Sequence, residues 1–402
     1  MNALTNKNRI YWIDAAKSIG IFLVFYGHVL EKLYRLDQPG IFSQYKFIYA
    51  FHMPFFFFIS GFFFRRTNKS IWQILGNLFR KRILPVWTFG ILAVPLWFIH
   101  MKLVDGNIDF NTTAQKAYRY LRGQPELNSV TWFLVCLFTV ELIAHLTVRR
   151  TRKRFFILVI AGIFFRFGLE LTENIAETVT SLGLYKNTWY LHEATVAFGF
   201  YALGYALLDP IKKIINMKII WRLGLLLLSL GITILTYDLN KNFDGFVVVM
   251  KNSWHGESLY FLITALSGIL FMIMLASLIP QLKLIEYFGS NTLILIGING
   301  VFHTFVNPHL AKLINDQSSV EITVFSLLVT VASFTISVPI IMFFNRYVPQ
   351  LIGKPHQQGP WLPKLGPIQI PLFTNFVNWM VNAFGSVAGN SQNPRNVDGS
   401  RQ

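Results

Sequence analysis

The sequence predicts an all-α, polytopic integral membrane protein with about ten transmembrane helices in one bundle. Hydrophobic residues make up 53% of the 402 residues and charged residues only 14%, whereas soluble globular chains carry roughly a quarter charged residues. Mean hydropathy is +0.46, and apolar runs of about twenty residues, the length that crosses a bilayer core, recur along most of the chain. Short clusters of Lys and Arg separate these runs. Together these features indicate a chain whose main solvent is lipid.

Ten spans are expected when about twenty apolar residues are assigned to each helix. They cover residues 13–33, 47–64, 83–103, 130–148, 155–171, 188–208, 223–237, 259–279, 292–310 and 322–344. In this count the basic clusters at 65–82, 149–154 and 212–222 all fall on one side, and the acidic stretch 170–177 falls on the other. Because Lys and Arg concentrate in cytoplasmic loops, both termini are expected in the cytoplasm.

The net charge of +17 does not indicate a nucleic-acid partner. The basic residues lie in loops beside apolar runs, not along an amphipathic face, so membrane lipid is the expected contact and no nucleic acid is expected. A single cysteine, Cys136, excludes an intrachain disulfide and a Cys-based zinc site. Asp14 and Lys17 interrupt the first apolar run, so we expect that segment to be retained and not cleaved as a signal peptide.

Residues 1–347 are expected to form the transmembrane domain, and residues 348–402 a partly disordered cytoplasmic tail. From Gly353 onward the composition shifts to Pro, Gly, Gln and Asn, as in a segment without its own core. Apolar residues recur at helical spacing near 372–385. This pattern indicates either a helix that lies in the membrane interface or a disordered stretch with a chance pattern.

Three ionisable residues share one face of the first span. Asp14 and Lys17 lie near its cytoplasmic end, and His28 follows Lys17 by eleven residues. At 100° per residue this spacing returns Lys17 and His28 to nearly the same face, about 16 Å apart along the axis. Charged groups at membrane depth are costly and usually mark a site or pathway. The stripe is therefore a candidate functional feature.

Two further histidines are predicted at a similar depth. His52 lies about 20 Å of helix from Arg65 in the second span, and His303 about 17 Å from Thr292 in the ninth. The alternative is that a histidine on a membrane helix only hydrogen-bonds a neighbouring helix. No set of histidines and carboxylates has clear metal-ligand spacing, so no metal is expected.

The third span opens with the basic sequence Arg80-Lys81-Arg82. A guanidinium group can bind phosphate with two parallel hydrogen bonds, and a helix N-terminus adds its own dipole. The cluster thus suits the phosphates of a nucleotide-bearing coenzyme. Its alternative role is to set topology next to anionic lipid.

These residues together resemble the membrane acyltransferase-3 family, which includes bacterial O-acetyltransferases of surface polysaccharides and fucose 4-O-acetylase-like proteins. The similarity covers about residues 9–347, and the first ninety carry most of it. The matching elements are Lys17 with His28, preceded by Asp14; Phe51-His52-Met53-Pro54 with Ile59-Ser60-Gly61-Phe62; and Arg80 with Arg82. Weaker matches are Trp132-Phe133-Leu134 with Glu141, residues 199–205, and residues 289–293 leading to His303. The chain departs from the family in lacking the tyrosines often found before that last histidine.

The resemblance implies a bacterial inner-membrane O-acyltransferase. It implies transfer of acetyl from cytoplasmic acetyl-CoA, with succinyl-CoA as the other candidate donor, to a hydroxyl of a surface polysaccharide or its lipid-linked glycan precursor. No permanently bound cofactor is expected, and polysaccharide assembly proteins are expected partners. The sequence leaves open which sugar and hydroxyl are modified, and the oligomeric state.

The resemblance also implies roles for the site residues. His28 would act as general base or, as the second alternative, as an acyl carrier. His52 would orient the acceptor or polarise the thioester carbonyl, and Asp14 would position Lys17. Lys17, Arg80 and Arg82 would hold the coenzyme phosphates. The competing functions are a proton-coupled transporter or exporter of a small solute or glycolipid, which ionisable residues within spans would also suit, and a membrane scaffold.

Overall fold

The computed structural model describes residues 10–34, 41–151, 153–181, 188–241, 245–314 and 318–366, without the side chains of residues 105 and 171–181. Within these ranges every regular element is a helix, and the extended backbone pairs only at an isolated bridge between Val249 and Trp254. The predicted all-α fold class is therefore confirmed.

The described helices are unequal in length, and short π-helical and 3₁₀ turns join several of them. The α-helices are α1 (Tyr11–Tyr34), α2 (Phe42–Tyr49), α3 (His52–Gly61), α4 (Ile71–Leu78), α5 (Leu84–His100), α6 (Phe110–Leu121), α7 (Trp132–Thr147), α8 (Arg154–Ser181), α9 (Leu191–Ile215), α10 (Ile219–Thr236), α11 (Ser258–Leu278), α12 (Lys283–Ser290), α13 (Thr292–Val301), α14 (Asn307–Ala311) and α15 (Ser319–Tyr347). The π-helical turns are η1 (Phe79–Ile83), η2 (Met101–Asp105) and η6 (Phe302–Val306). The 3₁₀ turns are η3 (Ser129–Thr131), η4 (Thr188–Tyr190), η5 (Met250–Asn252) and η7 (Pro349–Ile352).

Eight helical segments of the described chain are long and apolar enough to cross a membrane. They are Tyr11–Tyr34, Ile71–Val104, Ser129–Thr147, Thr188–Ile215, Ile219–Thr236, Ser258–Leu278, Thr292–Ala311 and Ser319–Tyr347. Each overlaps one of the ten predicted spans. The other two predicted spans correspond to the α2–α3 pair and to α8. The chain is thus a multi-pass membrane protein, while its orientation and the location of its termini remain predictions.

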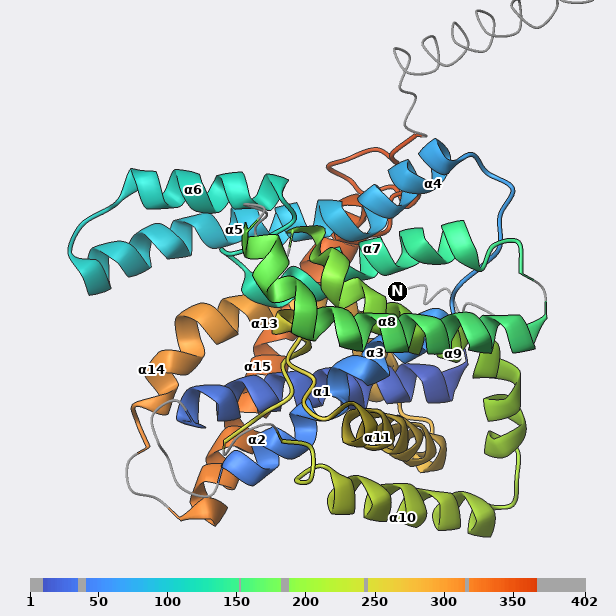
Figure 1. The fold of residues 1–402 in the computed structure, drawn as a ribbon. Coiled ribbons are helices and arrows are strands. Elements are labelled where there is room, and N and C mark those ends of the chain that lie inside the picture. The colour runs from blue at the N-terminus through green and yellow to red at the C-terminus, as the bar shows by residue number, and fades with distance from the viewer. Residues whose placement is uncertain are drawn as a thin grey trace, which may run out of the picture. The chain divides into compact units, whose positions relative to one another are not determined.

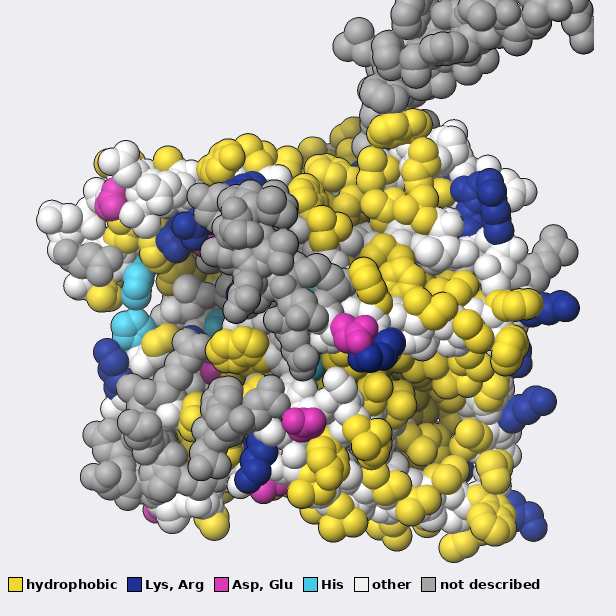
Figure 2. Space-filling model, viewed as in Figure 1, with side chains coloured by type: hydrophobic (Ala, Val, Ile, Leu, Met, Phe, Trp, Pro, Cys, Tyr) yellow, Lys and Arg dark blue, Asp and Glu magenta, His cyan; other side chains and the backbone are white. Residues whose placement is uncertain are grey.

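The surface agrees with a lipid environment. Large apolar side chains are exposed along the outer helices, for example Leu227, Leu228 and Leu235 on α10. Figure 2 shows hydrophobic side chains over much of one face, with Lys and Arg along one edge of that view. Water would disfavour so many exposed apolar groups in one region, whereas lipid tails would not.

Helix α1 lies at the centre of the helices that build the site. It contacts α2, α3, α11, α12, α13, α14 and α15 (Figure 1). The approach of α12 is close, because a Cβ atom on Gly289 would collide with the backbone of Asp14. Asp14 and Glu31, near opposite ends of α1, are 6% and 8% exposed. These two acidic side chains therefore face protein, and Asp14 is the buried member of the predicted stripe, whereas Lys17 and His28 are partly exposed.

The second predicted span is broken into α2 and α3 at residues 50–51. Pro54 lies in the first turn of α3, where it needs no backbone N–H, but its ring would clash with the carbonyl of Ala50 in a continuous helix. At the break the Ile48 carbonyl accepts from the Phe51 N–H at 3.4 Å, and the His52 Nδ1 lies 2.9 Å from the same oxygen. The His52 ring is therefore anchored to the end of α2.

Helix α3 is held at its other end by a close crossing with α9. A Cβ atom on Gly61 would collide with the carbonyl oxygen of Tyr201, and one on Gly204 with that of Phe58. Small residues at such a crossing let two backbones approach closely, the usual packing device within membranes.

The chain after α15 stays packed as far as it is described. The Gln350 Nε2 donates to the carbonyl of Leu362, and the ring of Trp361 contacts those of Phe343 and Tyr347 on α15. Residues up to Leu365 belong to the same compact unit as the helices. The helix predicted near 372–385 lies outside the described residues.

Candidate active site

One cavity of about 740 Å³ gathers the histidines predicted at membrane depth. Its walls come from α1, α2, α3, the chain around α5 and α6, the start of α7, the segment 245–254 and η6. His28, His52 and His303 all line it. The sequence placed these residues at a common depth, and the structure brings them to a common space.

His28 and His303 are direct neighbours. Their ring centroids are 4.5 Å apart, although 275 positions separate the two residues in the chain. His303 belongs to the π-helical turn η6, which follows α13 directly. A π-helical turn changes the direction of side chains along a helix and often occurs at functional sites. Here it turns the His303 ring toward α1.

Asn299 holds the ring of His28 in one orientation. The Asn299 Oδ1 is hydrogen-bonded to the His28 Nδ1, and Asn299 is fully buried. An amide oxygen only accepts, so the proton is on Nδ1 and the lone pair of the neutral ring is on Nε2. Nε2 is therefore the atom of His28 that can take a proton. The sequence analysis did not identify Asn299 as a site residue. The one feature that could have indicated it is its position four residues before His303, on the same helical face.

A tyrosine and a carboxylate lie next to the histidines. The Tyr49 hydroxyl donates to the Glu31 Oε2 at 3.0 Å, and both residues line the cavity. The Tyr49 ring also packs on His52, with centroids 4.6 Å apart. Neither Glu31 nor Tyr49 stood out in the sequence, because Glu31 follows the apolar part of the first span and Tyr49 was assigned to a continuous helix.

The cavity lining changes from apolar to polar along α1. Val24 is followed by His28 and then by Glu31 and Lys32. Met53 and Phe56, which follow His52 on α3, continue the apolar part. The histidines thus lie where the apolar and charged parts of the wall meet.

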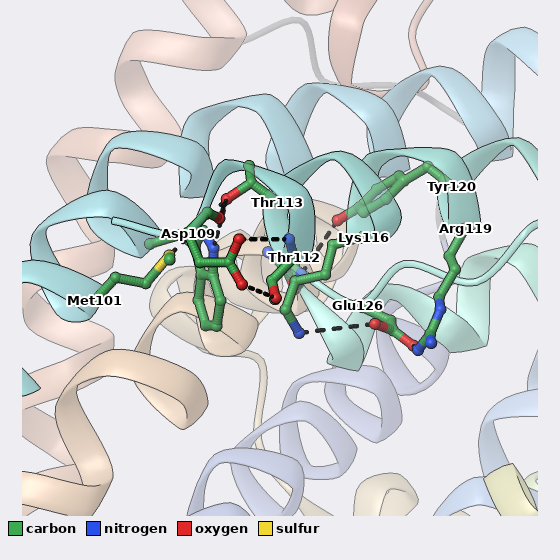
Figure 3. Close-up of polar contacts among 10 residues, drawn as sticks. Met101, Asp109, Thr112, Thr113, Lys116, Arg119, Tyr120 and Glu126 are labelled. Atoms are coloured by element: carbon green, nitrogen blue, oxygen red, sulfur yellow. Dashed lines mark hydrogen bonds and ion pairs between the residues drawn. The ribbon is translucent and has the colours of Figure 1, made fainter. Parts of the chain in front are cut away.

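One polar wall is built by α6 and the chain after it (Figure 3). The Asp109 carboxylate caps α6 and accepts from the Thr112 hydroxyl at 2.5 Å, and these hydrogen bonds hold the pKa of Asp109 below its ordinary value. Further along, Glu126 pairs with Lys116 at 3.7 Å and with Arg119. Lys116 and Glu126 line the cavity. This short polar helix was not among the predicted spans.

A second wall is the segment between α10 and α11, which lines the cavity mainly with apolar side chains and adds Lys251 and Asn252. Val249 and Trp254 exchange two backbone hydrogen bonds of 2.9 and 3.1 Å around η5. Asn240 donates to the backbone carbonyl of His255 at 2.9 Å, and burial lowers the pKa of the His255 imidazole to about 3. A neutral imidazole fits this buried position. The segment therefore presents Lys251 and Trp254 to the cavity from a well-anchored backbone.

Asp14 and Lys17 form an ion pair, as their spacing suggests. Lys17 Nζ is 2.6 Å from the Asp14 Oδ1, and it also lies 5.6 Å from the centre of the Phe63 ring. Neither residue lines the cavity. The eleven-residue spacing corresponds to about 16 Å along α1, so Lys17 and His28 occupy separate regions of the same helix.

Arg82 is engaged within the protein. Its Nε donates to the Glu141 Oε2 at 2.9 Å and its Nη2 to the Glu141 Oε1 at 2.6 Å, which makes a two-point pair between η1 and α7. Glu141 is 9% exposed. The pair occupies the edge of the guanidinium that would otherwise bind phosphate with two hydrogen bonds. Arg80, on the same π-helical turn, has no hydrogen bond of this kind among the described residues.

The comparisons with known proteins identify the family of the chain. A family of acyltransferase domains matches residues 10–342 of the chain. The curated proteins and the solved structures that were compared gave no match. The family match extends from the start of α1 into α15 and so includes the cavity, the Asp14–Lys17 pair and the Arg82–Glu141 pair. The chain therefore belongs to the acyltransferase-3 family and is a membrane acyltransferase.

Proposed function

We propose that this acyltransferase moves an acetyl group from cytoplasmic acetyl-CoA to a hydroxyl of a surface polysaccharide or of its lipid-linked precursor. The observation that carries the proposal is the position of His28. This histidine lines a cavity of about 740 Å³ and is hydrogen-bonded through Nδ1 to Asn299. That bond leaves the lone pair on Nε2, as a general base requires. Family membership favours a transferase over the transporter considered above.

The proposed reaction is a direct acyl transfer. The acceptor hydroxyl gives its proton to the His28 Nε2 while the hydroxyl oxygen attacks the thioester carbonyl carbon. The tetrahedral intermediate then breaks its carbon–sulfur bond, the coenzyme leaves as thiolate, and the proton on His28 returns to sulfur. The products are an O-acetyl ester and coenzyme A, so the atoms and the proton balance.

His52 is suited to one of its two candidate roles. Its Nδ1 lies 2.9 Å from the Ile48 carbonyl, an oxygen that only accepts, so the proton is on Nδ1 and the lone pair on Nε2. A neutral ring in this tautomer accepts a hydrogen bond through Nε2. It would therefore orient the acceptor hydroxyl, because polarising the thioester carbonyl requires a donor.

The donor would approach from the end of α1 that carries Asp14 and Lys17. If Lys17 and Arg80 bind the coenzyme phosphates, the extended pantetheine arm must cover about 16 Å to reach His28. The rings of Phe55 and Phe56 pack against α1 at Gly20, which lies between Lys17 and His28 in the chain. An arm that followed this face of α1 would therefore pass these two rings.

A reconstitution experiment tests the proposal. The purified protein in lipid nanodiscs would receive acetyl-CoA labelled in the acetyl group, with and without O-deacetylated surface glycan from a bacterium that makes such esters. We expect label in the glycan as an alkali-labile ester and coenzyme A release that depends on the glycan. The His28→Gln protein, at equal yield and thermal stability, should neither label the glycan nor release coenzyme A in its presence. Uptake of glycan or solute without thioester cleavage would instead favour the transporter.

A further inference from the structure

The cavity contains a group of metal-ligating side chains of which the proposed acyl transfer uses only one. His28, Glu31 and His303 each offer a ligand atom, and these atoms all lie within 4.8 Å of one another. His28 and Glu31 are three residues apart on α1 and so share a face, and η6 contributes His303. We propose that this cluster reversibly binds a divalent transition-metal ion such as Zn²⁺, and that the bound ion inhibits acyl transfer. The inhibition rests on the proposed function, whereas the binding does not.

The donor set selects the class of ion. Two imidazoles and one carboxylate form a set that zinc enzymes use, with a fourth position left to a small ligand. Ca²⁺ and Mg²⁺ prefer oxygen ligands and would be poor occupants. Imidazole suits Zn²⁺, Co²⁺, Ni²⁺ and Cu²⁺, so geometry and supply would decide among these.

Neighbouring groups orient two of the three ligands. Asn299 accepts from the His28 Nδ1–H, which fixes the ring with its Nε2 lone pair available for an ion. Tyr49 donates to one oxygen of Glu31 at 3.0 Å. Metal-binding histidines nearly always donate their other ring N–H in this way, and ligand carboxylates are likewise hydrogen-bonded. These two contacts come from separate elements, α13 and α2, and both favour ligation.

The spacing requires the ligands to move closer together. In tetrahedral coordination with Zn–N and Zn–O distances of about 2.0–2.2 Å, two ligand atoms of one ion lie about 3.3–3.6 Å apart. The three ligand atoms, which now lie within 4.8 Å of one another, must therefore approach by up to about 1.5 Å. All three side chains border the cavity, which gives them room to move and leaves a coordination position open. Lys32 and Lys251 line the same space, and their charge would oppose a dication and keep the affinity moderate.

The inhibition follows because the ion and the acceptor's proton would bind the same atom, the His28 Nε2. An ion on the His28 Nε2 takes the lone pair that would receive the acceptor's proton, and it occupies the space beside it. The metal should therefore compete with the glycan acceptor. It should not compete with acetyl-CoA phosphates at Lys17, which lie about 16 Å away along α1.

Metal binding is tested first, in an experiment that needs no acyl transfer. Chelator-treated protein in nanodiscs would be titrated with Co²⁺, whose visible absorption reports ligand type and number, and then with Zn²⁺ to displace it. We expect one strong site per chain. Glu31→Gln and His303→Gln should each weaken binding about 10- to 100-fold. His309→Gln is the matched control, because it removes an exposed histidine six residues after His303 and should change nothing.

Two binding results would overturn the inference. The first is the absence of saturable Co²⁺ binding to the wild-type protein. The second is binding that survives both Glu31→Gln and His303→Gln in folded protein, or that is lost in His309→Gln. If either cluster variant fails to fold, the wild-type protein still provides a test, because acceptor glycan should displace Co²⁺ and acetyl-CoA should not.

Activity then tests the inhibitory role. We expect Zn²⁺ to inhibit transfer over the concentration range in which it binds, with relief by chelator and by raised acceptor. A chelated enzyme that is inactive until Zn²⁺ is added would overturn the inhibitory role, and the base assignment of His28 with it. Metal binding in a protein that transfers no acetyl group under any condition would leave the site standing and overturn only the inhibitory role, together with the proposed function.

Discussion

The histidine cavity and two ion pairs outside it, Lys17–Asp14 and Arg82–Glu141, hold their polar groups in different ways. In the cavity the imidazoles of His28 and His52 bond to uncharged partners, an amide and a backbone carbonyl, beside about 740 Å³ of space. Outside it Lys17 pairs with Asp14 within α1, and Arg82 on η1 pairs with Glu141 on α7. One region leaves ring nitrogens able to exchange protons, while the other neutralises charge within the protein.

This difference separates residues that the sequence treated alike. Asp14 was predicted on the same stripe as His28, yet it lies with Lys17 away from the cavity. Arg80 and Arg82 were assigned one role, yet only Arg82 bridges two helices. Chemistry is thus expected from the cavity, coenzyme binding from Arg80 and Lys17, and helix positioning from Arg82. The following variants test that division.

The largest effect is expected at His28. His28→Gln keeps a hydrogen-bonding side chain but cannot accept and return a proton, so we expect transfer to fall about 10²- to 10⁴-fold, the usual contribution of a general base. The measurement is O-acetyl transfer to glycan, scored beside yield and thermal stability. His309→Gln, a histidine variant outside the cavity, should stay near wild type. Near-normal transfer by His28→Gln would make His28 a packing residue.

The next largest effect is expected at Asn299, which acts through His28. Asn299→Ala frees the ring to rotate and to change tautomer, and we expect a loss of roughly 10- to 100-fold, as for groups that orient a functional histidine. The loss should appear in kcat, with KM for acetyl-CoA unchanged. Asn299→Asp keeps an acceptor oxygen and should recover part of the activity. An equal loss in Ala and Asp variants of normal stability would argue against a positioning role.

Arg82 and Arg80 should respond differently to the same substitution. Arg82→Ala leaves the buried Glu141 carboxylate without its partner, and we expect a stability loss near the low end of the about 3–5 kcal/mol typical of broken buried pairs, because Arg82 keeps some solvent contact. Arg80→Ala should leave thermal stability unchanged and raise KM for acetyl-CoA. Thermal unfolding and donor titration of both variants measure the contrast.

A double variant sharpens this comparison. Arg82→Met with Glu141→Leu removes both charges and should restore much of the lost stability, since buried pairs can often be replaced by apolar residues of similar size. If the double variant is stable but still has a raised KM for acetyl-CoA, Arg82 binds the donor as well. If KM returns to the wild-type value, its role is positional.

The features predicted best from sequence are those carried by long local patterns. The apolar runs predicted the membrane class, and the spacing of Lys17 and His28 predicted a polar stripe on α1, of which Asp14 is buried and Lys17 and His28 are partly exposed. Helical periodicity needs only one segment, so a single sequence reveals it. The break between α2 and α3 was missed because the surrounding run is uniformly apolar, although Pro54 was a visible signal.

Contacts between distant segments could not be predicted in the same way. Asn299 meets His28 across 271 positions, and Glu141 meets Arg82 across 59. No local period links such residues, and each side chain alone is ordinary for a membrane helix. The cavity walls formed by α6 and by residues 245–254 were likewise missed, because segments between predicted spans were treated as connections.

The smallest effect is expected at the Lys46–Asp238 ion pair, which contrasts with the Lys17–Asp14 and Arg82–Glu141 pairs because Asp238 is largely exposed. The buried Lys46 on α2 contacts the Asp238 Oδ1 at 2.7 Å, and this bond holds the pKa of Asp238 below its ordinary value of 3.8. A carboxyl group with a lowered folded-state pKa stabilises the fold above its unfolded-state pKa, and that contribution is lost as pH falls through the folded-state value. Wild-type melting temperature should therefore fall more steeply than that of Asp238→Asn as pH drops from 5 to below 3.8. Above pH 5 the wild type should be slightly the more stable, because exposed pairs contribute little. Parallel melting curves at every pH would show that Lys46 is stabilised mainly by its second contact, the Asp238 backbone carbonyl at 3.3 Å.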